Sequence, residues 1–172
     1  IEIEYQSSYN KEGQGFQHVI DPEDKSEYVY TDFEAYYAHG LFPCFDQPDI
    51  KGTYTLSVDA PADWKVIANE PSTESREASG RVHVRFAKTK PLSTYLVFLG
   101  AGPFVEWSDT KGEIPLYVYA RKSLAKHLDV EKLFDTSRKG LEFFGKYFAH
   151  PYPFSKFGLI FIPEFVAGAM EN

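Results

Sequence analysis

The period of the hydrophobic pattern constrains the fold more than any other feature of this chain. Up to about residue 103, short runs alternate apolar with polar residues, and Gly, Pro, Asn and Asp separate the runs. Residues 54–58 and 82–86 are two such runs. A period of two buries one face of a strand and leaves the other in water. The first hundred residues are therefore predicted to form antiparallel sheets, packed as a sandwich or bent into a saddle.

Two further stretches of this region also predict strands. Residues 1–5, Ile-Glu-Ile-Glu-Tyr, alternate in the same way. Residues 92–100 are more continuously apolar, which is typical of a strand between two layers. The chain starts without Met or a signal-peptide pattern, and its last residues form no polar tail. We therefore expect both ends to be cut from a longer protein.

Beyond residue 103 the pattern changes to that of a helix. A predicted strand pair, residues 104–107 and 115–119, comes first. From Val130 to Phe148, apolar residues then recur at steps of three and four, with charged residues on the other faces. This is the period of an amphipathic α-helix. We place a domain junction near Gly112, which divides the chain into domains 1–112 and 113–172.

Prolines set the end of the predicted helix. Pro151 and Pro153 cannot continue a helix and favour extended conformations in the residues before them. The helix should therefore end near residues 149–150. Residues 157–163 are apolar and predict a buried strand.

Composition excludes several classes of protein. A chain of 172 residues with 43% hydrophobic residues can bury a sizeable core. Its formal net charge of -7 disfavours a nucleic-acid partner, which needs clustered Lys and Arg. Cys44 is the single cysteine, so neither an intrachain disulfide nor a Cys-rich zinc site can form. No apolar run approaches the roughly 20 residues of a membrane span, so we expect a soluble segment, with cytoplasm or periplasm left open.

Three short motifs stand out by their order and spacing. They are Tyr-Thr-Asp-Phe-Glu at 30–34, Phe-Pro-Cys-Phe-Asp-Gln-Pro at 42–48 and Gly-Ala-Met-Glu-Asn at 168–172. In these motifs the chain resembles the M1 (gluzincin) family of zinc aminopeptidases. Residues 168–172 match the family's exopeptidase motif at all five positions, and the other two are close to Thr-Gln-Phe-Glu and Phe-Pro-Cys-Phe-Asp-Glu-Pro.

The resemblance covers essentially the whole chain and implies its fold class. That fold is mainly β. An amino-terminal antiparallel β-sandwich or saddle domain is followed by the first strands and long helix of a thermolysin-like α+β catalytic domain. The resemblance would place the domain junction about where the hydrophobic pattern changes.

The resemblance implies a role for two carboxylates, Glu34 and Glu171. An aminopeptidase must tell a free α-ammonium group from an internal peptide nitrogen. Carboxylates that hold the cation make charge-assisted hydrogen bonds, and an internal peptide would leave them desolvated and unpaired. By resemblance, Glu171 comes from the edge of the catalytic domain and Glu34 from the amino-terminal domain, so the site is expected to straddle the domain interface.

The resemblance implies that the other residues of the motif at 168–172 bind the substrate as well. The backbone of Gly168 and Ala169 is expected to bind an extended substrate as an added strand at a sheet edge. Gly168 suits this role because a residue without Cβ lets another backbone approach closely. Met170 either lines the pocket for the first side chain or fills the core. Asn172 completes the motif.

Residues 42–48 are predicted to be structural. We expect Phe42 and Phe45 in a core, residues 46–48 in a turn, and Cys44 buried and inert. A metal site built from His39, Cys44 and the nearby aspartates fits no standard zinc spacing. None of the five histidines begins His-Glu-x-x-His.

We therefore expect no catalytic residue and no metal ligand in these 172 residues. The resemblance implies that zinc, its ligands and the catalytic groups lie beyond Asn172. The parent protein would remove amino-terminal residues from peptides through a zinc-activated water. This chain would supply substrate recognition only and be inactive alone. Its partners would be peptides with a free amino terminus and the rest of the catalytic domain in cis.

Two other functions are compatible with the sequence. The parent could be a non-catalytic M1-like scaffold, which would have no use for the amine anchor at Glu171. The chain could also be a free-standing β-sandwich binding module, although a functional motif is an unusual end for one. Epoxide-hydrolysing relatives usually carry Gly-Gly-Met-Glu-Asn, so Ala169 favours a peptidase.

Overall fold

The computed structural model describes residues 1–10, 12–165 and 167–172, and the chain divides into two compact units. Unit 1 consists of residues 1–103 together with 163–172, and unit 2 of residues 104–162. The predicted junction near Gly112 is a boundary between domains of a longer protein. The division of this chain into two compact units does not test it, so it stays a prediction. The fold is mainly β, as expected.

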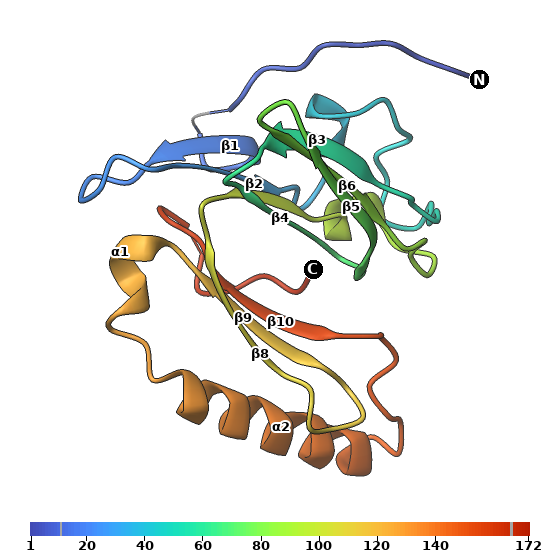
Figure 1. The fold of residues 1–172 in the computed structure, drawn as a ribbon. Helices are drawn as coiled ribbons and strands as arrows, with labels where there is room; N and C mark the ends of the chain where they lie inside the picture. Colours follow the sequence, from blue (N-terminus) through green and yellow to red (C-terminus); the bar gives the residue numbers. More distant parts are fainter. Residues whose placement is uncertain (11, 166) are drawn as a thin grey trace. The chain divides into compact units, whose positions relative to one another are not determined.

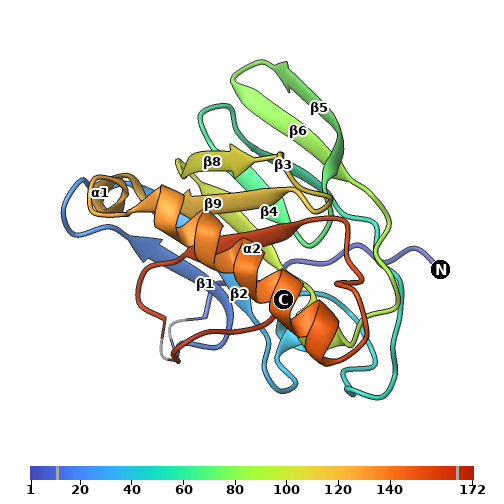
Figure 2. The same ribbon diagram turned by 90° about the horizontal axis from the view of Figure 1, so that it is seen from below.

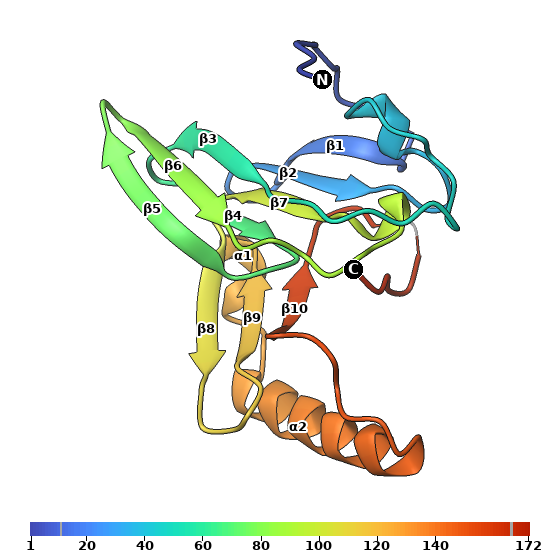
Figure 3. The same cartoon turned by 90° about the vertical axis from the view of Figure 1, so that its right-hand side faces the viewer.

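Unit 1 contains two antiparallel sheets (Figures 1 and 3). The four-stranded sheet has the order β1-β2-β7-β4, with β1 Gly15–Ile20, β2 Glu27–Asp32, β7 Leu99–Gly102 and β4 Lys65–Ala68. The three-stranded sheet has the order β3-β6-β5, with β3 Ser57–Pro61, β6 Arg81–Phe86 and β5 Ser72–Ala78. Short 3-10 helices occupy Ala38–Gly40 and Thr94–Leu96.

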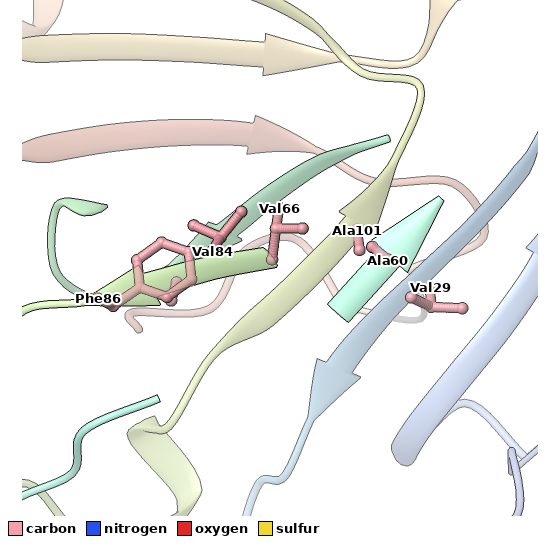
Figure 4. Packing of buried hydrophobic residues seen from close by; sticks show 7 residues of the cluster. Val29, Ala60, Val66, Val84, Phe86 and Ala101 are labelled. Atoms are coloured by element: carbon pink, nitrogen blue, oxygen red, sulfur yellow. The ribbon is translucent and has the colours of Figure 1, made fainter. Parts of the chain in front are cut away.

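One apolar cluster joins the two sheets of unit 1 (Figure 4). The four-stranded sheet contributes buried residues from three strands: Val29, Val66, Ala68 and Ala101. The three-stranded sheet contributes Ala60, Val84 and Phe86. Residues 82–86 bury Val84 and Phe86 and expose Arg85, as their alternation predicts. The sandwich follows from this shared burial, because an isolated sheet would leave one apolar face in water.

Two strand predictions in unit 1 are wrong. Residues 1–9 form no strand, and Ile1 and Ile3 are exposed. Their alternation has no neighbouring strand against which to pair or bury. Residues 92–100 are broken by the 3-10 helix before β7, because the Asn69 amide donates to the Leu96 carbonyl (2.8 Å) and accepts from the Phe98 N–H (2.8 Å).

Unit 2 is a three-stranded mixed sheet with one long helix. Its order is β10-β9-β8, with β8 Val105–Asp109, β9 Leu116–Ala120 and β10 Phe157–Phe161. β8 pairs with β9 antiparallel, and β10 pairs with β9 parallel. The short helix α1 Lys122–Ala125 and the helix α2 Val130–Tyr147 connect β9 to β10. Figure 2 shows α2 lying across one face of this sheet.

The helix α2 begins and ends where the sequence predicts. The Asp129 side chain caps the amino terminus by accepting from the Lys132 N–H (3.1 Å). After Tyr147 the chain leaves the helix, and Ala149 adopts a positive φ of 50° before Pro151. Phe134 is buried against Leu116 and Val118 of β9. β10 is only half-buried, because it lies at the edge of the sheet.

The carboxyl-terminal half of α2 is rich in exposed aromatic side chains, namely Phe143, Phe144, Tyr147 and Phe148. Beside it lies an apolar pocket of about 580 Å³, bounded by α2, residues 150–153 and Phe157. Over residues 1–10, 12–165 and 167–172, neither α-helix combines the length and apolar content that a membrane crossing requires.

Candidate substrate-binding site

Both predicted anchor carboxylates belong to unit 1. Glu34 lies two residues beyond the end of β2, and Glu171 lies in the segment 163–172, which joins unit 1 after β10. Both residues are exposed. The chain therefore brings the two carboxylates into one compact unit, although they are far apart in sequence. Their joint action on one ligand stays a prediction.

Among the described residues, hydrogen bonds at both ends of segment 163–172 attach it to the rest of unit 1. The Tyr30 hydroxyl donates to the Glu164 carbonyl, and the Asn172 amide donates to the Leu96 carbonyl, each at 3.5 Å. Both distances are at the long end for hydrogen bonds, so each attachment is weak. Asn172, predicted as a substrate-binding residue, thus contacts the protein's own backbone.

Negative charge gathers along one side of β2. Tyr30 and Asp32 lie two residues apart and so face the same side of the strand, and both are buried. Burial raises the pKa of Tyr30 to about 12, and the charges of Asp32 and Glu164 add to this effect. Burial also raises the pKa of Asp32, and the charge of Glu34 acts in the same direction. Three carboxylates close enough to perturb these groups create an environment that favours a cation.

Glu34 lies just beyond the end of β2, and the Glu34–Ala35 peptide bond is cis. The Glu34 backbone acts to lower the pKa of Asp32 and so partly offsets the rise caused by burial. The Glu34 side chain is exposed, so its carboxylate is accessible to a ligand.

Residues 168–172 do not form a strand in the structure, contrary to the expected sheet edge. Segment 163–172 clusters with unit 1 instead of extending the sheet of unit 2. Among the described residues, nothing lies within 4 Å of a Cβ built on Gly168, and its φ is not positive. Its backbone conformation therefore does not require glycine, and the side of Gly168 on which a Cβ would lie is open. Ala169 is exposed and Met170 is half-buried, which leaves both interpretations of Met170 open.

The motif at 42–48 is a structural element, but not in the predicted way. Phe42 is half-buried and packs edge-on against Phe33 and Tyr54, with ring centroids 6.0 and 6.1 Å away. Phe45 is 84% exposed, so its predicted place in a core is wrong. The turn lies one residue later than predicted, because the Ile50 N–H bonds the Gln47 carbonyl (3.0 Å).

Asp46 is the centre of this motif. Its carboxylate accepts hydrogen bonds from the Thr94 hydroxyl (2.6 Å), the His39 N–H (2.9 Å) and the His39 ring (2.8 Å). Burial acts to raise the pKa of Asp46, but these hydrogen bonds outweigh it and hold the pKa below its usual value. Burial and the charge of Asp46 raise the pKa of the half-buried Cys44 thiol to about 11. Cys44 therefore stays protonated and is a poor nucleophile or metal ligand.

We expect Asp46→Asn to lower the free energy of unfolding by about 1–3 kcal/mol, since an amide cannot accept all three bonds. Because the folded pKa is depressed, the stabilisation is complete above the unfolded pKa of about 3.9 and is lost as pH falls through the folded value. Urea unfolding between pH 3 and 7 measures both effects. The exposed neighbour Asp49→Asn is the control, and equal stability of the two variants would contradict the prediction.

The site contains no metal centre in the described part of the chain. No three His, Cys, Asp or Glu side chains gather there closely enough to hold an ion. The group considered around His39 and Cys44 is instead a hydrogen-bond network centred on Asp46. The residues present do not fit a zinc site.

Sequence reasoning did not assign Glu164 to this region, and it gave Tyr30 no role beyond its place in the motif at 30–34. Their hydrogen bond joins residues 134 positions apart, a separation that no local pattern reveals. The period-two spacing of Tyr30 and Asp32 was the available signal, because it places both on the side of β2 that leads to Glu34.

The described residues form a β-sandwich with exposed acidic side chains and a second, mixed α+β unit. The chain belongs to peptidase family M1. Residues 1–96 match the model of the peptidase M1 N-terminal domain, and residues 133–172 match that of the peptidase family M1 domain.

Similar proteins come from bacteria, archaea and plants. Aminopeptidase N of Streptomyces lividans is 38% identical over 169 residues, which is 96% of this chain and 19% of the relative. Leucyl aminopeptidase of Saccharolobus solfataricus is 42% identical over 144 residues, 84% of this chain and 18% of the relative. Aminopeptidase M1 of Arabidopsis thaliana is 34% identical over 170 residues, which is 98% of this chain and 18% of the relative. The chain thus spans about a fifth of the length of these relatives.

Proposed function

We propose that the full-length protein containing this chain is an aminopeptidase that removes amino-terminal residues from peptides, and that this chain recognises the free α-ammonium group. The observation that supports the proposal most is that unit 1 presents two exposed carboxylates, Glu34 and Glu171, and that the charge of Glu34 acts on the buried Asp32 beside it. The names of the similar proteins agree with this activity.

Recognition and rejection would come from the same two groups. A substrate ammonium replaces water at both carboxylates and makes charge-assisted hydrogen bonds, which are stronger than neutral ones. The nitrogen of an internal peptide bond carries no charge, so it would leave Glu34 and Glu171 desolvated without compensation. This difference would restrict cleavage to the first residue of a peptide.

The remaining motif residues would position the substrate backbone. No described residue lies within 4 Å of a Cβ built on Gly168, and the Gly168 and Ala169 backbone would bind an extended peptide. Met170 would border the side chain of the first residue. Residues 1–112 would be the amino-terminal domain and 113–172 the start of a thermolysin-like catalytic domain, a division that lies between the two family matches.

We propose that the hydrolytic step uses groups outside this chain. We propose zinc as the cofactor of the full-length protein, held by residues outside this chain. Peptides with a free amino terminus would be its substrates, and the rest of the catalytic domain would be the partner of this chain in cis.

We expect the isolated chain of 172 residues to show no hydrolysis of leucyl or alanyl reporters, with or without added zinc. Its described residues contain no cluster of metal ligands. A metal-defined preparation, assayed beside the full-length protein, tests this expectation. Turnover by the isolated chain that survives further purification would contradict it.

The proposed activity itself is tested on the full-length protein. Hydrolysis of leucyl and alanyl reporters is measured before and after treatment with a chelator, and again after zinc is restored. Activity that disappears with the chelator and returns with zinc supports the proposal. A zinc-loaded protein that hydrolyses neither reporter would instead favour a non-catalytic scaffold.

A further inference from the structure

We propose that Thr31 and Asn69 are positioning residues for the ammonium anchor. They hold the backbone of residues 96–99, which contacts the chain on the way to Glu34 and again beside Glu171. The inference rests on the proposed function, because it assigns both residues a role through the two anchor carboxylates.

Residues 96–99 lie where the backbone pairing of β7 gives way to side-chain contacts. β7 lies between β2 and β4 (Figure 3). Its backbone pairing runs as far as Gly100 on the β2 side and Leu99 on the β4 side. The paired residues of β2 and β4 at these points are directly followed by Thr31 and Asn69. One polar side chain on each side is therefore placed to hold the backbone just before β7.

Thr31 holds residues 96–99 from the β2 side. Its hydroxyl accepts from the Leu99 N–H (2.9 Å) and donates to the Val97 carbonyl (3.3 Å). Thr31 is only 2% exposed, so removal of the hydroxyl would leave both backbone groups short of a partner. β2 ends one residue after Thr31, and Glu34 lies two residues beyond that end. The backbone of residues 97–99 is thereby tied to the chain that leads to Glu34.

Asn69 holds the same backbone from the β4 side. Its amide donates to the Leu96 carbonyl and accepts from the Phe98 N–H, each at 2.8 Å. The Leu96 carbonyl also accepts from the Asn172 amide (3.5 Å). Because this last bond is long, a small shift of the Leu96 carbonyl would break it. The residue beside Glu171 therefore depends on where Asn69 holds Leu96.

These hydrogen bonds connect the two parts of the candidate site through one short piece of backbone. The 3-10 helix that precedes it is fixed as well, since the Thr94 hydroxyl donates to the Asp46 carboxylate (2.6 Å). Two carboxylates can share one ammonium only at a set separation, and a misplacement of about 1 Å can cost about 100-fold. Loss of either side chain should therefore weaken ammonium binding and leave the chemical step unchanged.

The competing explanation is that Thr31 and Asn69 stabilise the fold and have no effect on the site. Both explanations predict a lower melting temperature when a hydrogen bond is removed. They differ in the kinetics of the folded protein. A structural role leaves KM unchanged, whereas a positioning role raises KM and leaves kcat unchanged.

The test uses the zinc-loaded full-length protein and steady-state hydrolysis of a leucyl reporter. Thr31→Val keeps the shape of the side chain and removes its hydrogen bonds, so we expect KM to rise about 10-fold and kcat to stay within about twofold. Thr31→Ser keeps the hydroxyl, so its KM should stay within about twofold of the wild type. Asn69→Ala should raise KM about 3- to 10-fold, and it replaces Thr31→Val if the latter does not fold.

Thr89→Val is the matched control. The Thr89 hydroxyl accepts from the Tyr54 N–H (2.9 Å), a bond of the same kind in unit 1 that involves neither residues 96–99 nor residues 163–172. Its KM should stay within about twofold of the wild type, and thermal melting compares its stability with that of Thr31→Val. Thr31→Val and Asn69→Ala variants that melt earlier but share the KM of Thr89→Val would overturn the positioning role.

A double-mutant cycle separates this inference from the proposed function. If Thr31 acts through the anchor, Thr31→Val changes KM by less than about twofold in the Glu34→Gln/Glu171→Gln background. A full effect in that background, or Thr31→Ser as impaired as Thr31→Val, would overturn the inference. An unchanged KM in Glu34→Gln/Glu171→Gln itself would overturn the anchor, and with it both proposals. Impaired glutamine variants beside an unaffected Thr31→Val would overturn only this inference.

Discussion

Replacement of Glu171 by glutamine in the full-length protein is expected to lower kcat/KM for a leucyl reporter by about 10- to 150-fold. A hydrogen bond to a charged group contributes about 1.5–3 kcal/mol, and each 1.4 kcal/mol is a factor of about ten. Glutamine keeps the size of the side chain and removes its charge. Because Glu171 is exposed, the substitution should leave folding intact. Steady-state kinetics with zinc-loaded protein measures the loss.

The matched control is Glu77→Gln, which removes an exposed carboxylate from β5, in the other sheet of unit 1. We expect that variant to stay within about twofold of the wild type, as surface substitutions usually do. Equal kinetics of Glu171→Gln and Glu77→Gln would contradict the assignment of Glu171. Metal content and thermal melting of the variant show whether its activity falls because zinc is lost or because the protein unfolds.

Glu34→Gln is expected to lower kcat/KM for the same reporter by about 10- to 100-fold, mainly through KM. The same charge-assisted interaction is lost, and because Glu34 is exposed the substitution should leave folding intact. The comparison of KM with kcat distinguishes binding from chemistry. Glu23→Gln, an exposed change in the loop between β1 and β2, is the control. A fall in kcat with unchanged KM would show that Glu34 does not act as a binding group.

Regular elements with a strong period could be predicted from sequence because their causes are local. The helix at 130–147 has an apolar stripe, an Asp129 cap and a proline stop close to its end. β6 and the β8–β9 pair follow from alternation. Residues 1–5 alternate equally well and form no strand. A strand needs a partner as well as a pattern, and the partner is not a local property.

Long-range contacts account for the other differences. The break before β7 depends on Asn69, which lies 27 residues from Leu96. The motif at 42–48 looked like core because of its aromatic residues, yet it is organised by the polar side chains of Asp46 and Thr94. Buried polar groups need hydrogen-bond partners, and sequence alone does not show where those partners lie.

For the candidate site, the resemblance to a family supplied Glu34 and Glu171, and physical reasoning supplied their chemistry. Neither could show that segment 163–172 joins unit 1, where both carboxylates lie.

The central claim is that Glu34 and Glu171 recognise a free α-ammonium group. The most direct test compares two competitive inhibitors of the full-length protein, leucinamide and 4-methylpentanamide, which differ only in the amino group. We predict that the wild type binds leucinamide at least about 100-fold more tightly, and that Glu34→Gln/Glu171→Gln reduces this preference to within about threefold without weakening the desamino compound. A double variant that keeps the wild-type preference would show that the ammonium is recognised elsewhere.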